Sequence, residues 1–450
     1  MKTDVAIIGG GPAGACAALR LAERGLESVI VEKVTFPRFH IGEAMTGECG
    51  GLVRELGFEE RMLAERHPHR HGARVYGPGR SPWFVPVMQR TEEGLQDQHT
   101  WHVRRSVFDA MLLEESERRG ATLVPGKAVK PLLNGGDTVR GVTVRSSEGD
   151  FDLEADLVLD CSGQGTFMAK HGLTGPKYLG AYDKQIAIFS QVVGVERDTG
   201  GTKEEQPGNT LIFYRSKFHW CWAIPLDDEV TSVGIVVPAQ YFLDRRESRE
   251  EFLRRELHEM HDELTRRLPV VEFVEDVHVI PNYSFQVSEF ARKGFICVGD
   301  SHRFIDPIFS FGLFAAIKEA GFAAETAARY IGEERREEVL DEHMLRCEQG
   351  LDIVEDLIDT FWENPIAFSV LAHLKCREDM IDIFAGRIYP EDGQPSPTVH
   401  RLRKLLQRER SYEGRFDSVP VGSRYHPERA ALWNATLDSV ETTERWMREN

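Results

Sequence analysis

Length, composition and charge exclude several classes of protein. The chain has 450 residues, with 55 Lys and Arg against 73 Asp and Glu, a formal net charge of −18 at pH 7. Such an acidic surface repels phosphate backbones, which argues against a nucleic-acid partner. We expect no signal peptide, because strand-like sequence starts at Asp4. No apolar run approaches the ~20 residues of a membrane-spanning helix, so we expect no membrane span.

The seven cysteines indicate a reducing compartment. They are odd in number, widely scattered and form no Cys-x-x-Cys pair: Cys16, Cys49, Cys161, Cys221, Cys297, Cys347 and Cys376. This pattern argues against both a disulfide framework and a structural zinc site. We therefore expect a cytoplasmic protein with no bound metal.

The amino-terminal residues predict a strand, a turn, a helix and a second strand. An apolar run at 5–8 precedes glycine-rich residues 9–14, and an amphipathic helix over 15–24 ends at Gly25. A second apolar strand follows at 28–31. This is a βαβ unit, and its short apolar strands predict a parallel sheet buried on both faces.

Later segments predict more strands of this sheet and a second, antiparallel sheet. A helix over 105–119 precedes strands near 121–124, 141–144 and 151–159, and β-rich runs near 185–195, 209–226 and 230–238 predict an antiparallel meander. We expect a charge-rich helix over 246–267, a strand over 295–298 and an alanine-rich helix over 314–330. The tail from about 337 is expected to be mostly helical, with a break at 389–397.

The glycine-rich turn has the pattern of a dinucleotide site. Residues 9–14 match Gly-x-Gly-x-x-Gly, and Glu32 follows 18 residues after the last glycine. Gly9 allows the tight turn, Gly11 lets the backbone approach a pyrophosphate, and Gly14 permits close helix–strand packing. The helix amino terminus attracts phosphates, and Glu32 can accept hydrogen bonds from ribose hydroxyls. The flanking strands and helix are the context that this motif requires.

Two further segments favour FAD as the dinucleotide. Val298-Gly299-Asp300 closes a predicted strand, which places Asp300 to hydrogen-bond the ribityl or pyrophosphate region. The segment 103–109 adds a cation, Arg105, near the same site. With these features, residues 3–330 resemble the flavin monooxygenases of the para-hydroxybenzoate hydroxylase type.

Two motifs narrow this resemblance to the flavin-dependent halogenases, especially the branch that acts on phenols and carrier-bound pyrroles. Residues 220–225 contain Trp-x-Trp-x-Ile-Pro, and residues 304–312 contain Phe-x-x-Pro-x-x-Ser-x-Gly. Arg38 with Ile41-Gly42-Glu43 resembles the family's loop beside the isoalloxazine ring. The implied fold is α/β (α+β): a Rossmann-like FAD-binding domain, an inserted antiparallel β-sheet substrate domain and a helical carboxy-terminal region.

The resemblance also implies a division of the chain. Residues 1–180 would form the first part of the FAD-binding domain, with substrate-side insertions near 65–100, and residues 181–285 the antiparallel subdomain. Residues 286–336 would return to the FAD-binding domain, and residues 337–450 would form the helical region. The residues implied to bind FAD are Gly9, Gly11, Pro12, Ala13, Gly14, Glu32, Lys33, Arg38, Gly42, Glu43, Arg105, Asp300, Pro307, Phe311 and Gly312.

The implied reaction uses reduced FAD and dioxygen to form a flavin hydroperoxide. A halide ion near Ser310 would then be oxidised, and the hypohalous acid would cross to an electron-rich aromatic or carrier-bound substrate. Trp220 and Trp222 lie two apart on a strand and share a face, so they can separate the flavin from another cavity or simply pack in the core. Ser162 replaces an aspartate that single-component hydroxylases carry, which by resemblance favours a separate flavin reductase as a transient partner.

One position departs from the family. Two residues before Gly72 the halogenases carry a lysine, and this chain has Arg70. An arginine stays protonated at physiological pH and cannot form a chloramine, although it can donate hydrogen bonds to an oxidant. A hydroxylase or dehydrogenase without halide chemistry is therefore the alternative, and a non-catalytic FAD-binding partner protein is a lower one. We interpret Arg70, Trp220, Trp222 and Ser310 as the catalytic candidates.

Histidines give weaker signals. His67, His69 and His71 alternate and would share one face of a strand, but no local carboxylate or cysteine completes a metal site. We interpret them as polar lining of a cavity or a solvated edge. His302, beside Asp300, is either an acid/base group near the flavin or a side chain that satisfies its loop.

Overall fold

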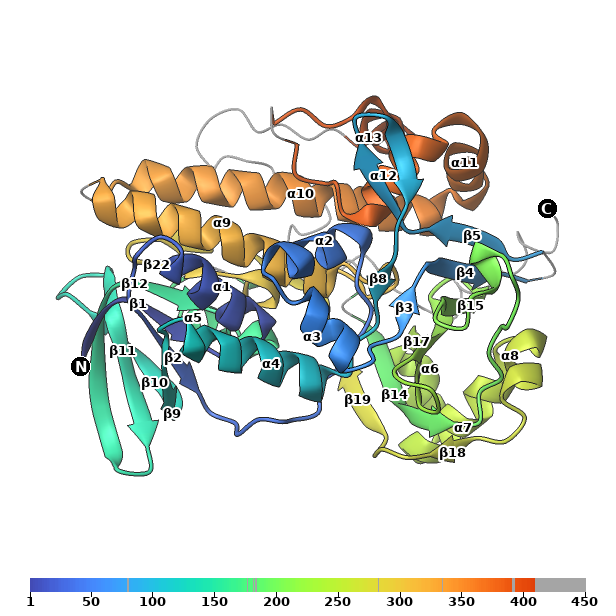
Figure 1. The fold of residues 1–450 in the computed structure, drawn as a ribbon, viewed down its shortest axis with the longest axis horizontal. Coiled ribbons are helices and arrows are strands. Elements are labelled where there is room, and N and C mark those ends of the chain that lie inside the picture. Colours follow the sequence, from blue (N-terminus) through green and yellow to red (C-terminus); the bar gives the residue numbers. More distant parts are fainter. Residues whose placement is uncertain are drawn as a thin grey trace.

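The computed structural model describes residues 1–408 except 79–80, 176, 181, 183, 282, 334 and 391–392. Two large sheets lie below a layer of long helices (Figure 1). The fold is the predicted mixture of a Rossmann-like parallel sheet, an antiparallel sheet and carboxy-terminal helices. Residues 409–450 of the predicted helical region lie outside the described residues. Within the described part of the chain, no helix is long and apolar enough to cross a membrane.

The first sheet contains the dinucleotide motif. Its main path runs β10-β11-β12-β1-β2-β9, and β22 joins it at β12. Its strands are β1 (Lys2–Ile8), β2 (Ser28–Glu32), β9 (Thr122–Pro125), β10 (Lys127–Leu133), β11 (Val139–Ser146), β12 (Gly149–Asp160), β21 (Ala291–Arg292) and β22 (Phe295–Cys297). Strand β1 pairs in parallel with β2 and β12, and β12 with β22. The carboxyl ends of these strands therefore meet at one edge, where open α/β sheets bind ligands.

The second sheet is antiparallel apart from the parallel pair β4 and β15. Its path is β18-β14-β17-β16-β15-β4-β5, with β19 paired to β14. Its strands are β4 (Gly72–Tyr76), β5 (Trp83–Pro86), β14 (Gln185–Val193), β15 (Thr210–Ser216), β16 (His219–Pro225), β17 (Thr231–Pro238), β18 (Glu272–Phe273) and β19 (His278–Pro281).

Short strand pairs complete the β structure. Strand β3 (His69–Arg70) pairs with β8 (Thr100–Trp101), and β6 (Met88–Thr91) pairs with β7 (Gly94–Asp97). Strands β13 (Lys177–Leu179), β20 (Phe285–Val287) and β23 (Arg303–Phe304) form a third sheet.

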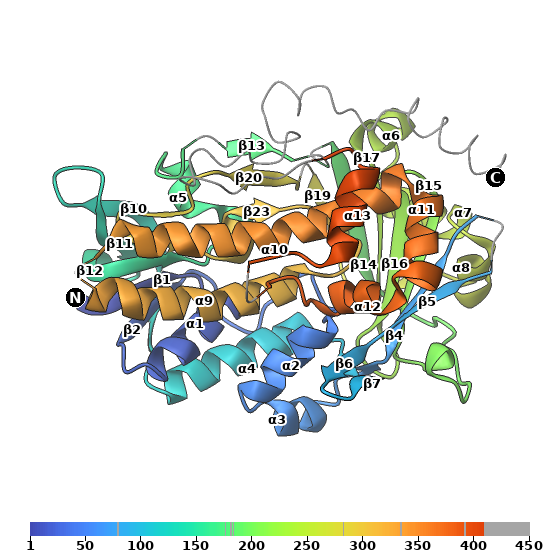
Figure 2. The same cartoon turned by 90° about the horizontal axis from the view of Figure 1, so that it is seen from above.

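The helices surround the two sheets (Figure 2). They are α1 (Pro12–Ala22), α2 (Gly47–Glu55), α3 (Glu59–Ala64), α4 (Arg105–Arg118), α5 (Phe167–Lys170), α6 (Ala239–Arg245), α7 (Arg249–Glu259), α8 (Asp262–Arg267), α9 (Gly312–Gly332), α10 (Glu337–Glu363), α11 (Pro365–Val370), α12 (Arg377–Ala385) and α13 (Pro397–Leu405). A π-helical turn, Leu371–Lys375, joins α11 to α12. Helix α9 packs along α1 and α10, and its alanines at the contacts, including Ala320 and Ala323, are buried.

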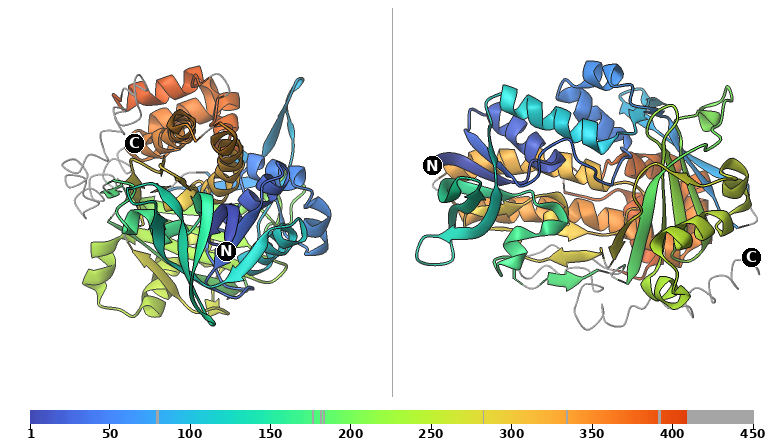
Figure 3. Two further views of the ribbon diagram at one scale, coloured as in Figure 1. Left: turned by 90° about the vertical axis from the view of Figure 1, so that its left-hand side faces the viewer. Right: turned by 90° about the horizontal axis from the view of Figure 1, so that it is seen from below.

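Both faces of the second sheet are buried. Alternate side chains of β16 divide between two cores: Trp220 and Trp222 join the large core shared with the first sheet, whereas Cys221 and Ala223 join a core closed by α7 and α8. Figure 3 shows these two helices against the outer face of the sheet. Successive side chains of a strand point to opposite faces, so the two tryptophans share one face. Because both faces are covered, every residue of the strand is buried.

Two predicted elements are divided in the structure. The β-rich run at 209–226 is a hairpin, β15 and β16, because the chain turns at Phe218, whose φ is 64°. The predicted helix over 246–267 is two helices, α7 and α8. His261 lies between them, and its ring accepts a hydrogen bond from the Glu263 amide at 3.0 Å, so it caps the second helix.

Candidate flavin site

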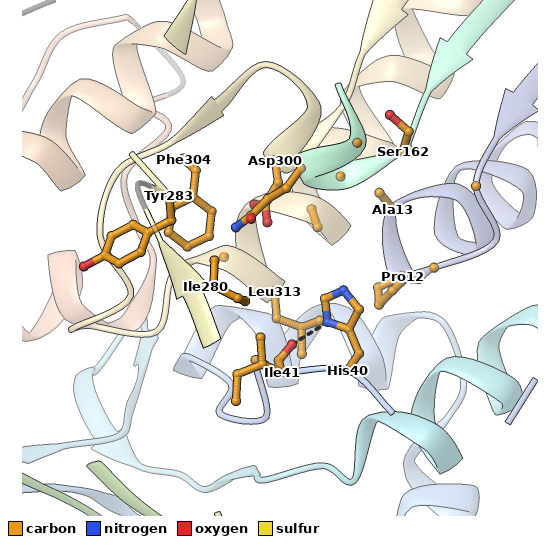
Figure 4. Close-up of a pocket in the computed structure, with 18 of the residues that line it drawn as sticks. Pro12, Ala13, His40, Ile41, Ser162, Ile280, Tyr283, Asp300, Phe304 and Leu313 are labelled. Atoms are coloured by element: carbon orange, nitrogen blue, oxygen red, sulfur yellow. Dashed lines mark hydrogen bonds between the residues drawn. The ribbon is translucent and has the colours of Figure 1, made fainter. Parts of the chain in front are cut away.

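A cavity of about 1390 Å³ opens at the carboxyl ends of the parallel strands. Its walls come from the glycine turn, the loop after β2, the inner face of the second sheet and the start of α9. Figure 4 shows Pro12 and Ala13 of α1 near Ser162 and Asp300 in this cavity. The predicted residues that line it are Gly9, Gly11, Pro12, Ala13, Glu32, Lys33, Arg38, Gly42, Glu43, Arg105, Trp220, Trp222, Asp300, Pro307, Ser310, Phe311 and Gly312.

The glycine turn leaves the amino terminus of α1 open to the cavity. Gly9 has φ 102°, and a Cβ there would lie 2.6 Å from the Cys161 carbonyl oxygen. A Cβ on Gly14 would lie 1.9 Å from the Gly9 carbonyl oxygen, so Gly14 acts through packing and does not line the cavity. Gly11 is the N-cap and brings no capping side chain. The first amides of the helix are thus available to an anion.

Glu32 and the cations near it complete this end of the cavity. The Glu32 carboxylate accepts from the Gly10 amide at 2.6 Å and from the Val34 amide at 2.8 Å, which fixes its orientation. Arg38 Nη2 lies 3.0 Å from Asp109 Oδ2, and within the described residues Arg38 Nη1 is buried without a hydrogen-bond partner. A buried guanidinium nitrogen without a partner is costly unless a ligand accepts from it.

Arg105 fixes the loop before α2. Its Nε and Nη2 donate to Asp109 at 2.6 and 2.9 Å, and its Nη1 donates to the Ile41 carbonyl at 2.7 Å. Arg105 therefore holds the 41–43 loop in place. It also lines the cavity, as predicted for a cation near this site.

FAD fits this group of residues. The open helix start and the Arg38 nitrogen suit a pyrophosphate, the oriented Glu32 carboxylate suits ribose hydroxyls, and the cavity volume exceeds the several hundred Å³ of an ordinary small-molecule site. The residues that would hold FAD are thus those predicted from the motif, with Gly14 supporting them from behind.

A hydrogen-bonded chain connects the wall of the second sheet to the loop before α2. Trp222 Nε1 donates to Ser232 Oγ at 3.2 Å, and Ser232 Oγ donates to Glu43 Oε2 at 3.2 Å. Burial raises the pKa of Glu43 to about 7, and Glu43 Oε1 has no partner among the described residues. A carboxyl group with a pKa near neutrality can give or take a proton at physiological pH. Sequence reasoning missed Ser232 because nothing in its local pattern marks it.

Two more carboxyl groups precede α9: Asp306 is buried, and Asp300 is partly exposed to the cavity. Burial raises the pKa of Asp300 to about 7 and likewise that of Asp306. Asp306 accepts from the Tyr283 hydroxyl at 2.9 Å and from the Ile308 amide at 3.0 Å. Ser310 adopts φ 61°, and its amide donates to the Pro307 carbonyl at 3.0 Å. Tyr283 and Asp306 were not predicted, because their pairing joins segments 23 residues apart.

Arg70 lies outside the large cavity. It lines a separate, smaller cavity of about 30 Å³, whose walls come from β4, β5 and α12, and Ile212 and Ile308 line both cavities. Arg70 Nη1 donates to the Met45 carbonyl at 2.6 Å, and its Nε is buried without a partner among the described residues. Burial lowers the pKa of Arg70 to about 10, which still leaves it protonated at neutral pH.

The histidines take structural positions. Strand β3 ends at Arg70, so the three histidines do not lie on one strand. The rings of His69 and His71 nevertheless lie near each other, with centroids 6.4 Å apart, and both lie beside His99. His69 stacks on His99 with ring centroids 4.2 Å apart. Among the described residues, no group of three or more His, Cys, Asp or Glu side chains is placed to hold a metal ion.

His302 supports the flavin cavity from behind and does not line it. Its Nε2 lies 2.9 Å from Glu319 Oε2, and its ring stacks on Phe290 at 4.0 Å. The Gly299 amide also donates to Glu319, at 2.9 Å. Of the two interpretations of His302, the structural one agrees with this arrangement.

Comparison with known proteins gives a consistent family. The FAD binding domain family matches residues 2–356. A 1H-pyrrole-2-carbonyl-(peptidyl-carrier protein) brominase of Pseudoalteromonas luteoviolacea is 31% identical over 400 residues, 88% of this chain and 95% of the relative. A chlorinase of the same carrier-bound group, from Pseudomonas fluorescens, is 25% identical over 428 residues, 90% of this chain and 93% of the relative.

A solved structure agrees with these sequence relatives. The flavin-dependent brominase Bmp2 matches with a TM-score of 0.84 at 30% identity, covering 90% of this chain and 98% of the brominase. The glycine turn, the paired tryptophans and the turn before α9 all lie around the one large cavity described above. The chain belongs to the FAD-binding domain family and, within it, to the flavin-dependent halogenases.

Proposed function

We propose that this enzyme halogenates an electron-rich aromatic acyl group while the group is attached to a carrier protein. The observation that carries the proposal is the pair of neighbouring cavities, one suited to FAD and one lined by Arg70, which share Ile212 and Ile308. The relatives named for pyrrole-2-carbonyl carrier proteins support the substrate class. A reaction divided between two chambers suits an oxidant made beside the flavin and used elsewhere.

When bound, reduced FAD would supply two of the four electrons that reduce dioxygen to water, and the halide ion, which is oxidised, would supply the other two. Overall, an aromatic C–H bond is replaced by a C–halogen bond, one proton is consumed with the halide, and both oxygen atoms leave as water. The protein contributes binding, orientation and exclusion of water. The amides of Phe311 and Gly312 would hold the halide near Ser310, since they lie at the start of a long helix. The Ser310 amide itself already donates to the Pro307 carbonyl.

The remaining side chains have separate roles in this proposal. Trp220 and Trp222 would wall the flavin cavity, and their ring centroids lie 5.7 Å apart. Glu43 would hold the proton that the reaction consumes, because its pKa is about 7. Arg70 would donate hydrogen bonds to the oxidant in the second cavity, since its Nε has no partner among the described residues.

Two aspects of the cellular setting belong to the same proposal. Reduced FAD would come from a separate flavin reductase, acting as a transient partner, because Ser162 stands in the flavin cavity where single-component hydroxylases carry an aspartate. A reducing cytoplasm is supported by the seven cysteines, all of which are free and buried. The boundaries at 180, 285 and 336 remain a proposal that limited proteolysis would test.

A hydroxylase without halide chemistry is the second candidate, and Arg70 is the observation that favours it. One experiment separates the two. The protein is incubated with FAD, a generic flavin reductase, NADH, air and either bromide or no halide, and the substrates are pyrrole-2-carbonyl carrier protein and a panel of free aromatics. Mass spectrometry should find a brominated acyl group only when bromide is present. A product that forms equally well without halide would establish the second candidate.

A further inference from the structure

A group of cations without ion-pair partners lies on the carboxy-terminal helices. Lys375 ends the π-helical turn, Arg377 begins α12, and Arg401 and Lys404 lie on α13; all four are exposed. No ion pair in the described part of the chain involves any of them. We call these four residues the basic patch. It stands out because the chain as a whole carries a formal charge of −18.

The residues of the basic patch come from neighbouring elements. Arg401 contacts the sulfur of Cys376, which lies between Lys375 and Arg377, so α13 packs directly beside the start of α12. Figure 2 shows α11, α12 and α13 gathered at one end of the molecule. Two other cations of this region face inward and are neutralised, because Arg403 and Arg408 each pair with Asp356 at 2.7 Å.

Nearby carboxylates do not cancel the patch. Glu378 pairs with Arg90 at 3.3 Å, and Asp379 accepts a hydrogen bond from the Thr398 hydroxyl at 2.6 Å. Both lie on the same helix as Arg377. Glu378 is neutralised by Arg90, whereas Asp379 keeps its negative charge because its partner is an uncharged hydroxyl, so four cations stand against one unpaired carboxylate. The local surface therefore keeps an excess of positive charge that an acidic partner can use.

The patch lies beside the second cavity. Trp83 lines that cavity. The ring centroids of Trp83 and His373 lie 5.4 Å apart, and His373 belongs to the π-helical turn that ends at Lys375. Phe384 of α12 lines the cavity as well. Leu374, 78% exposed, projects from the same turn. The π-helical turn therefore connects the basic patch to the wall of the second cavity.

We propose that the basic patch docks the carrier protein through an acidic face, which brings the tethered acyl group to the side of the molecule where Trp83 lines the second cavity. This inference rests on the proposed function and adds the docking surface to it. The charge of the enzyme supports the choice of partner. A strongly acidic chain repels an acidic carrier over most of its surface and attracts it where unpaired cations gather.

Binding of the carrier is the test, because it needs no turnover. The probe is fluorescently labelled pyrrole-2-carbonyl carrier protein, titrated with FAD-loaded full-length enzyme and followed by fluorescence anisotropy. The double variant Lys375→Glu/Arg377→Glu should raise the Kd by about tenfold or more, and added NaCl should weaken wild-type binding. Arg246→Glu is the matched control, since Arg246 is exposed at the end of α6 and should leave the Kd unchanged.

Hydrogen–deuterium exchange of the full chain identifies what covers the patch. Carrier addition should slow exchange in peptides spanning 371–377 and 400–405. If these peptides are already protected in the free enzyme and do not respond to the carrier, residues 409–450 or a second copy of the chain cover the patch and the proposal is wrong. An unchanged Kd in the double variant, or no binding by the wild type, would also overturn it.

Kinetics separate failure of docking from failure of the proposed function. The double variant should raise KM for the carrier-bound pyrrole and leave turnover of a small pyrrole-2-carbonyl thioester unchanged. If the wild type halogenates neither substrate but binds the carrier at the patch, docking stands and the proposed reaction fails. If it halogenates both with equal KM and the variant does not differ, the reaction stands and docking fails.

Discussion

The flavin cavity and the second cavity are built in different ways. The flavin cavity is shaped largely by the backbone, since the glycine turn, the ends of parallel strands and the open start of α1 determine what can bind. The second cavity is shaped by side chains from β4, β5, β15 and α12, which are far apart in the sequence. A short sequence motif predicts local backbone geometry well. It does not predict a cavity whose side chains come from distant parts of the chain. The cofactor could therefore be predicted from the sequence, whereas the substrate could not.

The largest effect on FAD binding is expected at Gly14, where two segments of the backbone lie closest together. Gly14→Ala places a Cβ 1.9 Å from the Gly9 carbonyl oxygen, so the turn must open and FAD binding should weaken by about a hundredfold, roughly 2.7 kcal/mol. Flavin fluorescence measures the Kd, with circular dichroism to confirm folding. Gly51→Ala is the control, because nothing lies within 4 Å of its Cβ and alanine favours the helix. Equal FAD affinity in both variants would show that the turn does not shape the site.

A second effect concerns the free-energy cost of burying the Glu43 carboxyl group in the wall of the flavin cavity. The raised pKa of Glu43 means that the folded state binds its proton more tightly than the unfolded chain does. Its contribution to stability is therefore full below about pH 4.5 and lost as the pH rises towards 7. Glu43→Gln should stabilise the FAD-free protein at pH 8 by about 2 kcal/mol, and the gain should vanish at pH 4.

Denaturant unfolding at the two pH values measures this difference. Glu60→Gln is the control, since Glu60 is exposed on α3 and should give no pH-dependent gain. A Glu43→Gln variant that is equally stabilised at pH 4 and pH 8, or destabilised at pH 8, would contradict a neutral carboxyl group at this position.

A third change sharpens the contrast between the cavities. Arg70→Lys introduces the side chain that the halogenases carry, and should raise brominated product by about tenfold if a proton-transferring amine helps the reaction. FAD affinity should not change, because Arg70 does not line the flavin cavity. Arg66→Lys is the control, because it makes the same change from guanidinium to ammonium at an exposed position. If Arg70→Lys weakens FAD binding as strongly as it alters the product, the two cavities are not independent.

The smallest effect is expected at Ser232. Its hydroxyl donates to Glu43 and lowers the pKa of that carboxyl against the larger effect of burial. Ser232→Ala should move the pH dependence of stability slightly upward and cost about 1 kcal/mol at pH 8 from the lost hydrogen bond. Unfolding curves across pH 5 to 8 check the direction. A downward move would mean that Ser232 donates elsewhere.

The sequence predicted elements whose cause is local and missed those whose cause is distant. The glycine turn, β1, α1 and β2 follow from residues next to one another in the chain. The alanine-rich α9 was predicted because small side chains allow close packing, and it is the helix against α1. In contrast, the cap at His261 that divides α7 from α8 depends on one side chain, which periodicity does not register.

The candidate site divides in the same way. Asp300 and Glu32 follow strand ends and were predicted to lie in the cavity, where the structure has them. The Ser232–Glu43 and Tyr283–Asp306 pairs join residues from different elements and leave no local pattern. The position of Arg70 behind Ile212 and Ile308 depends on how the two sheets and α12 pack, which no motif states.

The most direct measurement uses ¹⁸O-labelled dioxygen. FAD-loaded enzyme, a flavin reductase, NADH, bromide and pyrrole-2-carbonyl carrier protein react under labelled gas, and the acyl group is released for mass spectrometry. The account predicts a monobrominated acyl group with the paired isotope peaks of bromine and no ¹⁸O, because both oxygen atoms leave as water. An acyl group that retains ¹⁸O and carries no bromine would contradict it.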